Sequence, residues 1–217
     1  MTVLWGKDLR EMDRGEFLAL AAGFSGVCAD IGTGDARQLY RLAARDPARL
    51  YVGVDPVRDQ MLDIAVRLRR KPEKGGLGNL LLAVAAVERL PEALTDTAEQ
   101  VSVSFPWGSL LEAVVRPVPA SLRNLAAIAR DGASFAFLFT YAAAYEGGEM
   151  ERRQLPPLSL DYLNGAYRDT LAELGFQSER IEALEGGDAR TLGTRWAKRL
   201  ASGRARVYYR VEGRIRK

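Results

Sequence analysis

Histidine is absent from all 217 residues of the chain. Histidine is the general base of the Ser-His-Asp and Cys-His arrangements, and it is the commonest protein ligand of transition metals. Its absence excludes both kinds of triad and any histidine-based metal site. A reaction carried out by this chain must therefore depend on positioning the reactants rather than on a histidine base.

Cysteine and long apolar runs are also scarce. The single cysteine, Cys28, lies in a short apolar run and is expected to be a small buried core residue. One cysteine makes neither an intramolecular disulfide nor a zinc cluster, so we expect no metal. No apolar run approaches the roughly 18 residues of a membrane span, and the first residues lack the apolar core of a signal peptide. We therefore expect a cytoplasmic protein without a membrane segment.

The residues that are present indicate a globular α/β protein. Hydrophobic residues make up 47% of the chain, and its length is sufficient to bury a core. We assign residues 1–217 to a single domain, preceded by a short hairpin at residues 1–12. Residues 141–159 and 185–204 lack a clear periodicity, and we expect them to form loops on the substrate side.

Apolar runs typical of strands alternate with segments of helical spacing. The last two strands are joined without a clear helix, which favours an antiparallel pair at the end of the sheet. The pattern predicts a first strand beginning at Val27, then strands at 50–54, 80–84, 101–105, 134–140, 176–184 and 205–211, and helices at 14–22, 38–45, 57–70, 122–129 and 162–174.

The segment Asp30-Ile31-Gly32-Thr33-Gly34-Asp35 follows the first strand and is the centre of the pattern. Glycines at these two positions permit unusual backbone angles and leave no side chain to block a ligand. A strand, a glycine turn and a helix N-terminus place backbone N–H groups beside a bound small molecule. Because Arg37 occupies the third glycine position of the dinucleotide signature, the segment instead resembles motif I of S-adenosylmethionine (SAM) methyltransferases. A tight turn that binds nothing is the alternative.

A second acid supports a cofactor site. The next apolar run ends at Asp55, 21 residues after Gly34. In nucleotide-binding α/β folds an acid at this place accepts the ribose hydroxyls. Its presence favours a nucleoside-containing cofactor over an empty turn.

Methyl transfer is an in-line displacement, and it suits a chain without histidine if the acceptor has a free lone pair, as adenine N1 has. Phe105-Pro106-Trp107-Gly108 stands where the fourth strand leaves the sheet. Trp107 either packs in the core or stacks on a base. Trp196 lies in a basic, polar segment and has little reason to be buried, whereas Trp5 is expected to pack on the hairpin. Two loop tryptophans are suited to hold an extruded base by stacking.

The net charge is only +3, but basic residues are concentrated in two clusters. Such clusters are either solvated surface or a contact for nucleic acid. The first contains Arg67, Arg69, Arg70, Lys71 and Lys74, and the second contains Lys198, Arg199, Arg204, Arg206, Arg210, Arg214, Arg216 and Lys217.

Taken together, these segments resemble the aminoglycoside-resistance methyltransferases that act on N1 of adenine 1408 in 16S ribosomal RNA. The Pro-Trp-Gly and Trp-Ala-Lys-Arg-Leu segments are more specific than motif I. Ala36, where we expect glycine, is a mild departure, and Thr194 replaces a serine of some relatives. The matching segments are 30–35, 53–57, 71–77, 105–112, 153–158, 196–200 and 203–206.

The resemblance implies a Rossmann-like class I SAM-dependent methyltransferase with a seven-stranded, mostly parallel sheet, an antiparallel last strand and an N-terminal hairpin. It implies SAM as cofactor, S-adenosylhomocysteine as product, and a monomer that acts on 16S rRNA in the assembled 30S subunit. Another RNA base or a small molecule as acceptor, or a non-catalytic SAM- or RNA-binding protein, remain the alternatives.

The resemblance also implies residue roles. The SAM pocket is implied for Asp30, Gly32, Gly34, Asp55, Pro56, Ala86, Val87 and Glu88, with Ser109 and Thr194 at the methionine end. Trp107 and Trp196 are implied to sandwich the flipped adenine. RNA contacts are implied for Arg67, Arg70, Lys71, Arg153, Arg199, Arg204 and Arg206, with Glu146 on a nearby loop.

Overall fold

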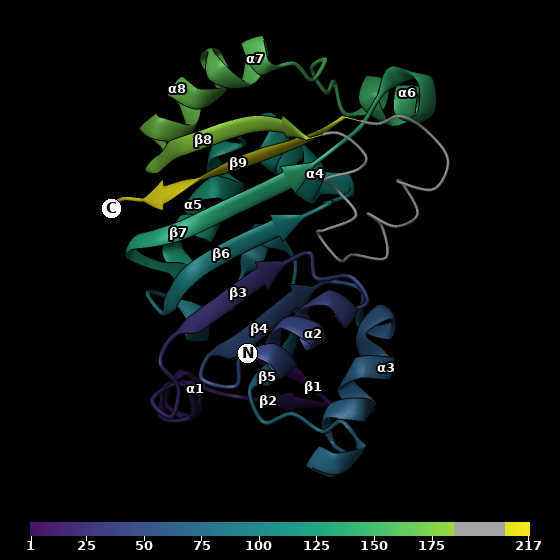
Figure 1. The fold of residues 1–217 in the computed structure, drawn as a ribbon, viewed down its shortest axis with the longest axis vertical. Coiled ribbons are helices and arrows are strands. Elements are labelled where there is room, and N and C mark those ends of the chain that lie inside the picture. Colours follow the sequence, from purple (N-terminus) through teal and green to yellow (C-terminus); the bar gives the residue numbers. More distant parts are fainter. Residues whose placement is uncertain (185–206) are drawn as a thin grey trace.

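A computed structural model of the chain describes residues 1–184 and 207–217. Its centre is a nine-stranded sheet of order β2-β1-β5-β4-β3-β6-β7-β9-β8 (Figure 1). The five strands from β5 to β7 are parallel, and β9 runs antiparallel to both β7 and β8. The strands are β1 (Thr2–Trp5), β2 (Asp8–Glu11), β3 (Val27–Ile31), β4 (Leu50–Asp55), β5 (Leu80–Val84), β6 (Ala98–Ser104), β7 (Ala129–Phe139), β8 (Phe176–Leu184) and β9 (Tyr208–Ile215).

The expected seven-stranded, mostly parallel sheet with an antiparallel last strand is confirmed by the strands from β5 to β8. β1 and β2 form a hairpin, and β1 pairs antiparallel with β5 at Val3 and Ala83. The hairpin therefore continues the sheet and widens it to nine strands.

Helices cover both faces of the sheet because strand side chains alternate between the faces. On one face, Leu39 of α2 and Met61 of α3 pack with Cys28 and Leu82. The larger core lies on the other face, where α1, α4, α5, α7 and α8 cover the sheet. The α-helices are α1 (Arg14–Ala21), α2 (Arg37–Arg45), α3 (Arg58–Leu68), α4 (Gly108–Val115), α5 (Pro119–Ile128), α6 (Ala143–Arg152), α7 (Leu160–Asn164) and α8 (Ala166–Glu173), and the short 3-10 turns are η1 (Pro72–Lys74), η2 (Val87–Arg89) and η3 (Glu92–Leu94).

Several predicted elements are corrected by the structure. The predicted loop at 141–159 contains α6, which is supported by ion pairs from Glu149 to Arg152 and Arg153 at helical spacing. The predicted helix at 162–174 is two helices, interrupted at Gly165. The last strand begins at Tyr208 and continues to Ile215, four residues beyond the predicted end at Val211.

In α1, Phe17 is buried, whereas Leu18 beside it is 42% exposed. Pro56 precedes the N-cap residue Val57, so the predicted helix at 57–70 begins at Arg58 and ends at Leu68. The buried position of Cys28 is confirmed. None of the helices in residues 1–184 and 207–217 is long and apolar enough to cross a membrane.

Candidate active site

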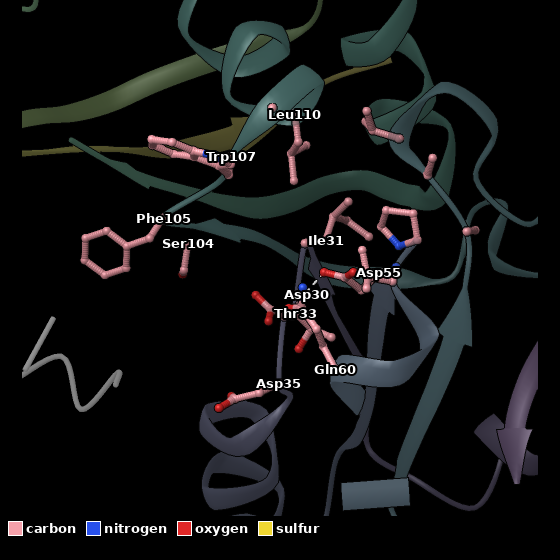
Figure 2. Close-up of a pocket in the computed structure, with 18 of the residues that line it drawn as sticks. Asp30, Ile31, Thr33, Asp35, Asp55, Gln60, Ser104, Phe105, Trp107 and Leu110 are labelled. Carbon is pink, nitrogen blue, oxygen red and sulfur yellow. Dashed lines mark hydrogen bonds between the residues drawn. The ribbon is translucent and has the colours of Figure 1, made fainter. Parts of the chain in front are cut away.

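A cavity of about 820 Å³ opens at the carboxyl ends of β3, β4, β5 and β6 (Figure 2). Its volume is in the range of small-molecule and cofactor sites, and its place is the one where open α/β sheets bind ligands. Most of the lining comes from four segments, 30–35 after β3, 55–57 after β4, 85–88 after β5 and 104–110 after β6, with additional residues from α2 and α3.

The turn after β3 requires its glycines. Gly32 and Gly34 have φ angles of +76° and +58°. The N–H of Gly32 donates to the carbonyl of Val54 over 2.8 Å, which fixes the turn to β4. A Cβ atom on Gly32 would lie 2.4 Å from Cδ2 of Leu110, so a side chain there would push Leu110 aside in addition to straining the backbone at its positive φ. Ala36 also has a left-handed φ of +54°, so the alanine that replaces the expected glycine carries backbone strain.

Asp55 is held in a fixed orientation at the end of β4. One carboxylate oxygen accepts the N–H of Gly34 over 2.9 Å, and the other accepts the N–H of Val57 over 2.8 Å. The residue is 8% exposed, and burial raises the pKa of its carboxyl while the two N–H groups oppose that rise. Its remaining lone pairs are suited to accept hydrogen bonds from the hydroxyls of a ribose.

Asp30 is a second carboxylate in the cavity wall. The hydroxyl of Ser102 donates to its Oδ1 over 2.7 Å. Burial raises the pKa of Asp30, and the nearby charge of Asp55 raises it further. Two partly desolvated carboxylates in one cavity fit a cofactor that carries positive charge and hydroxyl groups, as SAM does.

The cavity wall after β5 is fixed by a residue from α5. The side-chain amide of Asn124 donates to the carbonyls of Val87 and Glu88, each over 2.9 Å. The sequence prediction includes these two wall residues but not Asn124. No local signal could have found it, because it is 36 residues away from Glu88.

Trp107 is 56% exposed and precedes the first turn of α4, so the interpretation of Trp107 as a core residue is wrong. The preceding turn is firmly held. Phe105 has a left-handed φ of +50°, its N–H donates to the carbonyl of Leu138 over 2.7 Å, and its ring packs edge-to-face on Tyr208. Figure 2 shows Trp107 and Leu110 across the cavity from Asp55 and Gln60.

The predicted cofactor residues come together in this cavity. Those that line it are Asp30, Gly32, Gly34, Asp55, Pro56, Ala86, Val87, Glu88 and Ser109. Gln38 and Gln60 also line it and were missed, because a polar residue early in a helix has no distinctive signal. Predictions for Thr194, Trp196, Arg199, Arg204 and Arg206 fall outside the described residues.

A second cavity, which we call the basic groove, lies between α2 and α3 and has a volume of about 1070 Å³. It brings together two predicted RNA contacts, Arg67 and Arg70, while Lys71 is exposed beside it. Arg37 and Arg41 line both cavities, so the basic groove adjoins the cofactor cavity. Its lining residues are Lys7, Arg37, Tyr40, Arg41, Arg58, Leu62, Asp63, Ile64, Val66, Arg67, Arg70 and Lys74.

Arg153 is placed differently from Arg67 and Arg70. Its guanidinium pairs with Glu149 over 2.5 Å and with Glu112 over 3.2 Å, and its side chain is 19% exposed. The cluster ties α6 to α4. Glu146, in the same helix as Glu149, accepts the N–H of Ala142 over 2.9 Å.

Comparison with known proteins assigns the family. The sequence model of the NpmA family, described as 16S rRNA (adenine(1408)-N(1))-methyltransferase, matches residues 2–215. The chain belongs to this family. It is 38% identical to a 16S rRNA (adenine(1408)-N(1))-methyltransferase of Escherichia coli, over all of both chains. It is 36% identical to one of Streptoalloteichus tenebrarius, over 93% of this chain and 92% of that protein.

Solved structures of NpmA-family and related methyltransferases share the fold. A tryptophan-to-alanine mutant of the enzyme from Catenulisporales acidiphilia, crystallised with the cosubstrate SAM, matches with a TM-score of 0.90 at 35% identity, over 100% of this chain and 97% of that one. The 16S rRNA methyltransferase KamB matches with a TM-score of 0.90 at 33% identity, over the whole of both chains. This chain is therefore a SAM-dependent methyltransferase, and the alternative of a non-catalytic binding protein is not supported.

Proposed function

We propose that this enzyme uses SAM to methylate N1 of adenine 1408 in 16S rRNA and thereby confers aminoglycoside resistance. The observation that carries the proposal is the exposed Trp107 at a nucleoside-sized cavity that adjoins a basic groove. A base can stack on the tryptophan while the phosphates of the same RNA lie against basic side chains. The name shared by the relatives supplies the position on the RNA.

The cavity residues would hold SAM by its polar ends. Asp55 would accept the ribose hydroxyls, and Asp30 would face the positively charged part of the cofactor. SAM supplies an electrophilic methyl group. The segment after β5 would border the adenine ring of the cofactor through Ala86, Val87 and Glu88, and Ser109 would lie at the methionine end together with Thr194.

The target base would be bound by aromatic stacking. Trp107 forms one face of the proposed clamp, and Trp196 the other. N1 of adenine carries its own lone pair, so no residue has to remove a proton before transfer. This fits a chain that contains no histidine. Catalysis would then rest on holding N1 in line with the methyl group.

RNA docking is assigned to basic residues outside the cavity. Arg67, Arg70 and Lys71 are exposed and would contact phosphates, and we retain Arg199, Arg204 and Arg206 in the same role. Arg153 would take part only after its ion pairs with Glu112 and Glu149 open. Sparse phosphate contacts read the shape of folded RNA, so we propose the assembled 30S subunit as substrate. We also propose a monomer as the active form and the cytoplasm as the place of reaction.

Primer extension on 16S rRNA tests the proposal. N1-methyladenine blocks reverse transcriptase, so cells that express the enzyme should give a stop at adenine 1408. Purified 30S subunits should be methylated faster than free 16S rRNA. A matched Asp55→Ala variant should give no stop. A stop at another adenine would show that adenine 1408 is not the target. Efficient methylation of free 16S rRNA but not of 30S subunits would show that the 30S subunit is not the substrate.

A further inference from the structure

The N-terminal hairpin is joined to the end of α3 by a cation–π contact. The guanidinium carbon of Arg69 lies 3.6 Å from the centroid of the Trp5 ring. Arg10 approaches the same ring at 5.8 Å and pairs with Glu16 over 3.0 Å. Trp5 is 37% exposed, and the guanidinium of Arg69 covers one face of its ring.

The hairpin tip has a second tie to α3. Arg58 in the first turn of α3 donates to the carbonyl of Lys7 in the hairpin turn over 2.5 Å. Contacts at Arg58 and Arg69 therefore bracket the helix at its two ends. The backbone pairing of β1 with β5 is short, at Val3 and Ala83, and the side chains of Val3 and Leu4 are buried in the core, so the contacts to α3 act mainly on the exposed turn of the hairpin.

Arg69 faces away from the basic groove. Arg67 and Arg70, on either side of it in the sequence, both line the basic groove. Arg69 instead lines a separate cavity of about 280 Å³ beneath the hairpin, together with Trp5 and apolar residues such as Leu68 and Leu77. Arg69 therefore has different surroundings from Arg67 and Arg70. Their nearness in the sequence does not imply that all three bind phosphates.

We propose that Trp5 and Arg69 form a latch that fixes the segment following α3, so that Arg70 and Lys71 are presented to RNA. Arg69 is then a positioning residue that acts through Trp5 and makes no phosphate contact of its own. The inference deepens the proposed function and rests on it for the RNA contact. The planar guanidinium is required for stacking, so lysine at position 69 keeps the charge but weakens the latch.

A double-mutant cycle on binding to 30S subunits tests the latch. Trp5→Leu and Arg69→Gln should each weaken binding by about two- to fivefold, which corresponds to an exposed cation–π contact. The double variant should be no weaker than either single variant, because Arg69 has no separate contact to lose. The KM for 30S subunits should rise with kcat unchanged, and Trp5→Tyr should restore binding. If Arg69→Gln costs as much in the Trp5→Leu background as in the wild type, the latch is overturned.

The salt dependence separates positioning from phosphate contact. Arg70→Gln should lower the slope of log affinity against log salt by roughly 0.7–0.9, as the loss of one phosphate contact does. Arg69→Gln should leave that slope unchanged, and an equal fall in both variants would overturn the latch.

Thermal melts of the single and double variants distinguish a failure of the latch from a failure of the proposed function. Coupling between positions 5 and 69 in the melts, with no 30S binding by the wild type, would overturn the proposed function and leave the latch only as a structural contact between Trp5 and Arg69. Additive melting effects of the two substitutions would overturn the latch alone.

Discussion

Asp55 owes its place in the site to two backbone N–H groups that hold its carboxylate open to the cavity. Asp55→Ala removes a charge-assisted acceptor, so we expect SAM affinity to fall by roughly 1.5–3 kcal/mol. Titration calorimetry measures this directly. Glu179→Ala, which removes an exposed carboxylate on β8, is the control and should leave the affinity unchanged. An unaltered affinity in Asp55→Ala would remove Asp55 from the cofactor site.

The same carboxylate predicts a pH dependence. Burial raises the pKa of Asp55 above its ordinary value of 3.8, which favours the protonated form in the folded protein. Its contribution to folding stability is therefore present at low pH and is lost as the pH rises through the raised pKa. A protonated carboxyl is a poorer acceptor for ribose hydroxyls. We expect SAM affinity to fall on acidification with a midpoint above 3.8, and to fall less in Asp55→Asn, where only Asp30 titrates in the pair.

Trp107 is available for stacking because it is exposed rather than packed. Trp107→Ala should lower single-turnover methylation at least about tenfold, since a stacked base is worth roughly 1–3 kcal/mol. Folding stability and 30S affinity should change much less, and Trp107→Phe should recover part of the rate. A variant that melts several degrees lower yet turns over normally would contradict the clamp.

Residue chemistry explains which site residues the sequence could predict. Gly32, Gly34 and Asp55 stand at strand ends, where the residue type alone indicates backbone geometry or ribose binding. Asn124 acts on Glu88 across 36 positions, and only the folded arrangement of α5 brings them together. The placement of Arg69 on Trp5 likewise depends on how the hairpin meets α3.

At the level of elements, Asn79 holds the end of α2. The Nδ2 atom of its buried side-chain amide lies 2.9, 3.1 and 3.0 Å from the carbonyl oxygens of Ala43, Asp46 and Arg49, so its two N–H groups are shared among three acceptors. Asn79→Ala leaves these groups unpaired and should cost about 1–3 kcal/mol of stability, which lowers Tm by roughly 2–12 °C. Asn164→Ala, an exposed asparagine that donates to the carbonyl of Leu160, is the matched control and should change Tm little. Equal changes in Tm for the two substitutions would show that the hydrogen bonds of Asn79 contribute no more to stability than that of an exposed asparagine.

Strands were more predictable than helices for a physical reason. β5 begins and ends at the predicted residues because a continuous apolar run marks a buried strand directly, and the bounds of β8 were also predicted, although most of its residues are exposed or half-buried. α6 contains two glycines and few apolar positions, and it is stabilised by ion pairs instead. α4 was missed because its apolar residues follow Trp107 without a capping side chain.

The molecule as a whole separates its charged surfaces. The cofactor cavity lies at the carboxyl ends of the parallel strands, and Arg37 and Arg41 connect it to the basic groove. Arg130 stands at the amino end of β7, opposite the carboxyl ends of the strands where the cavity opens, and pairs with Glu99 over 2.8 Å. If docking uses the groove side alone, charge reversal at the groove and charge reversal at Arg130 must have different effects on RNA binding.

Arg67 is the sharpest probe of that difference. Its guanidinium stacks on Tyr40 at 4.5 Å, and the Tyr40 hydroxyl donates to the carbonyl of Gly75 over 2.8 Å, so the exposed arginine is held beside the groove. Wild-type binding to 30S subunits should weaken steeply with salt, because phosphate contacts release counterions. Arg67→Glu should weaken binding and reduce the salt slope by about 1, with SAM affinity unchanged. Arg130→Glu should leave both binding and slope as they are, whereas equal losses in the two variants would mean that net charge, and not the groove, governs docking.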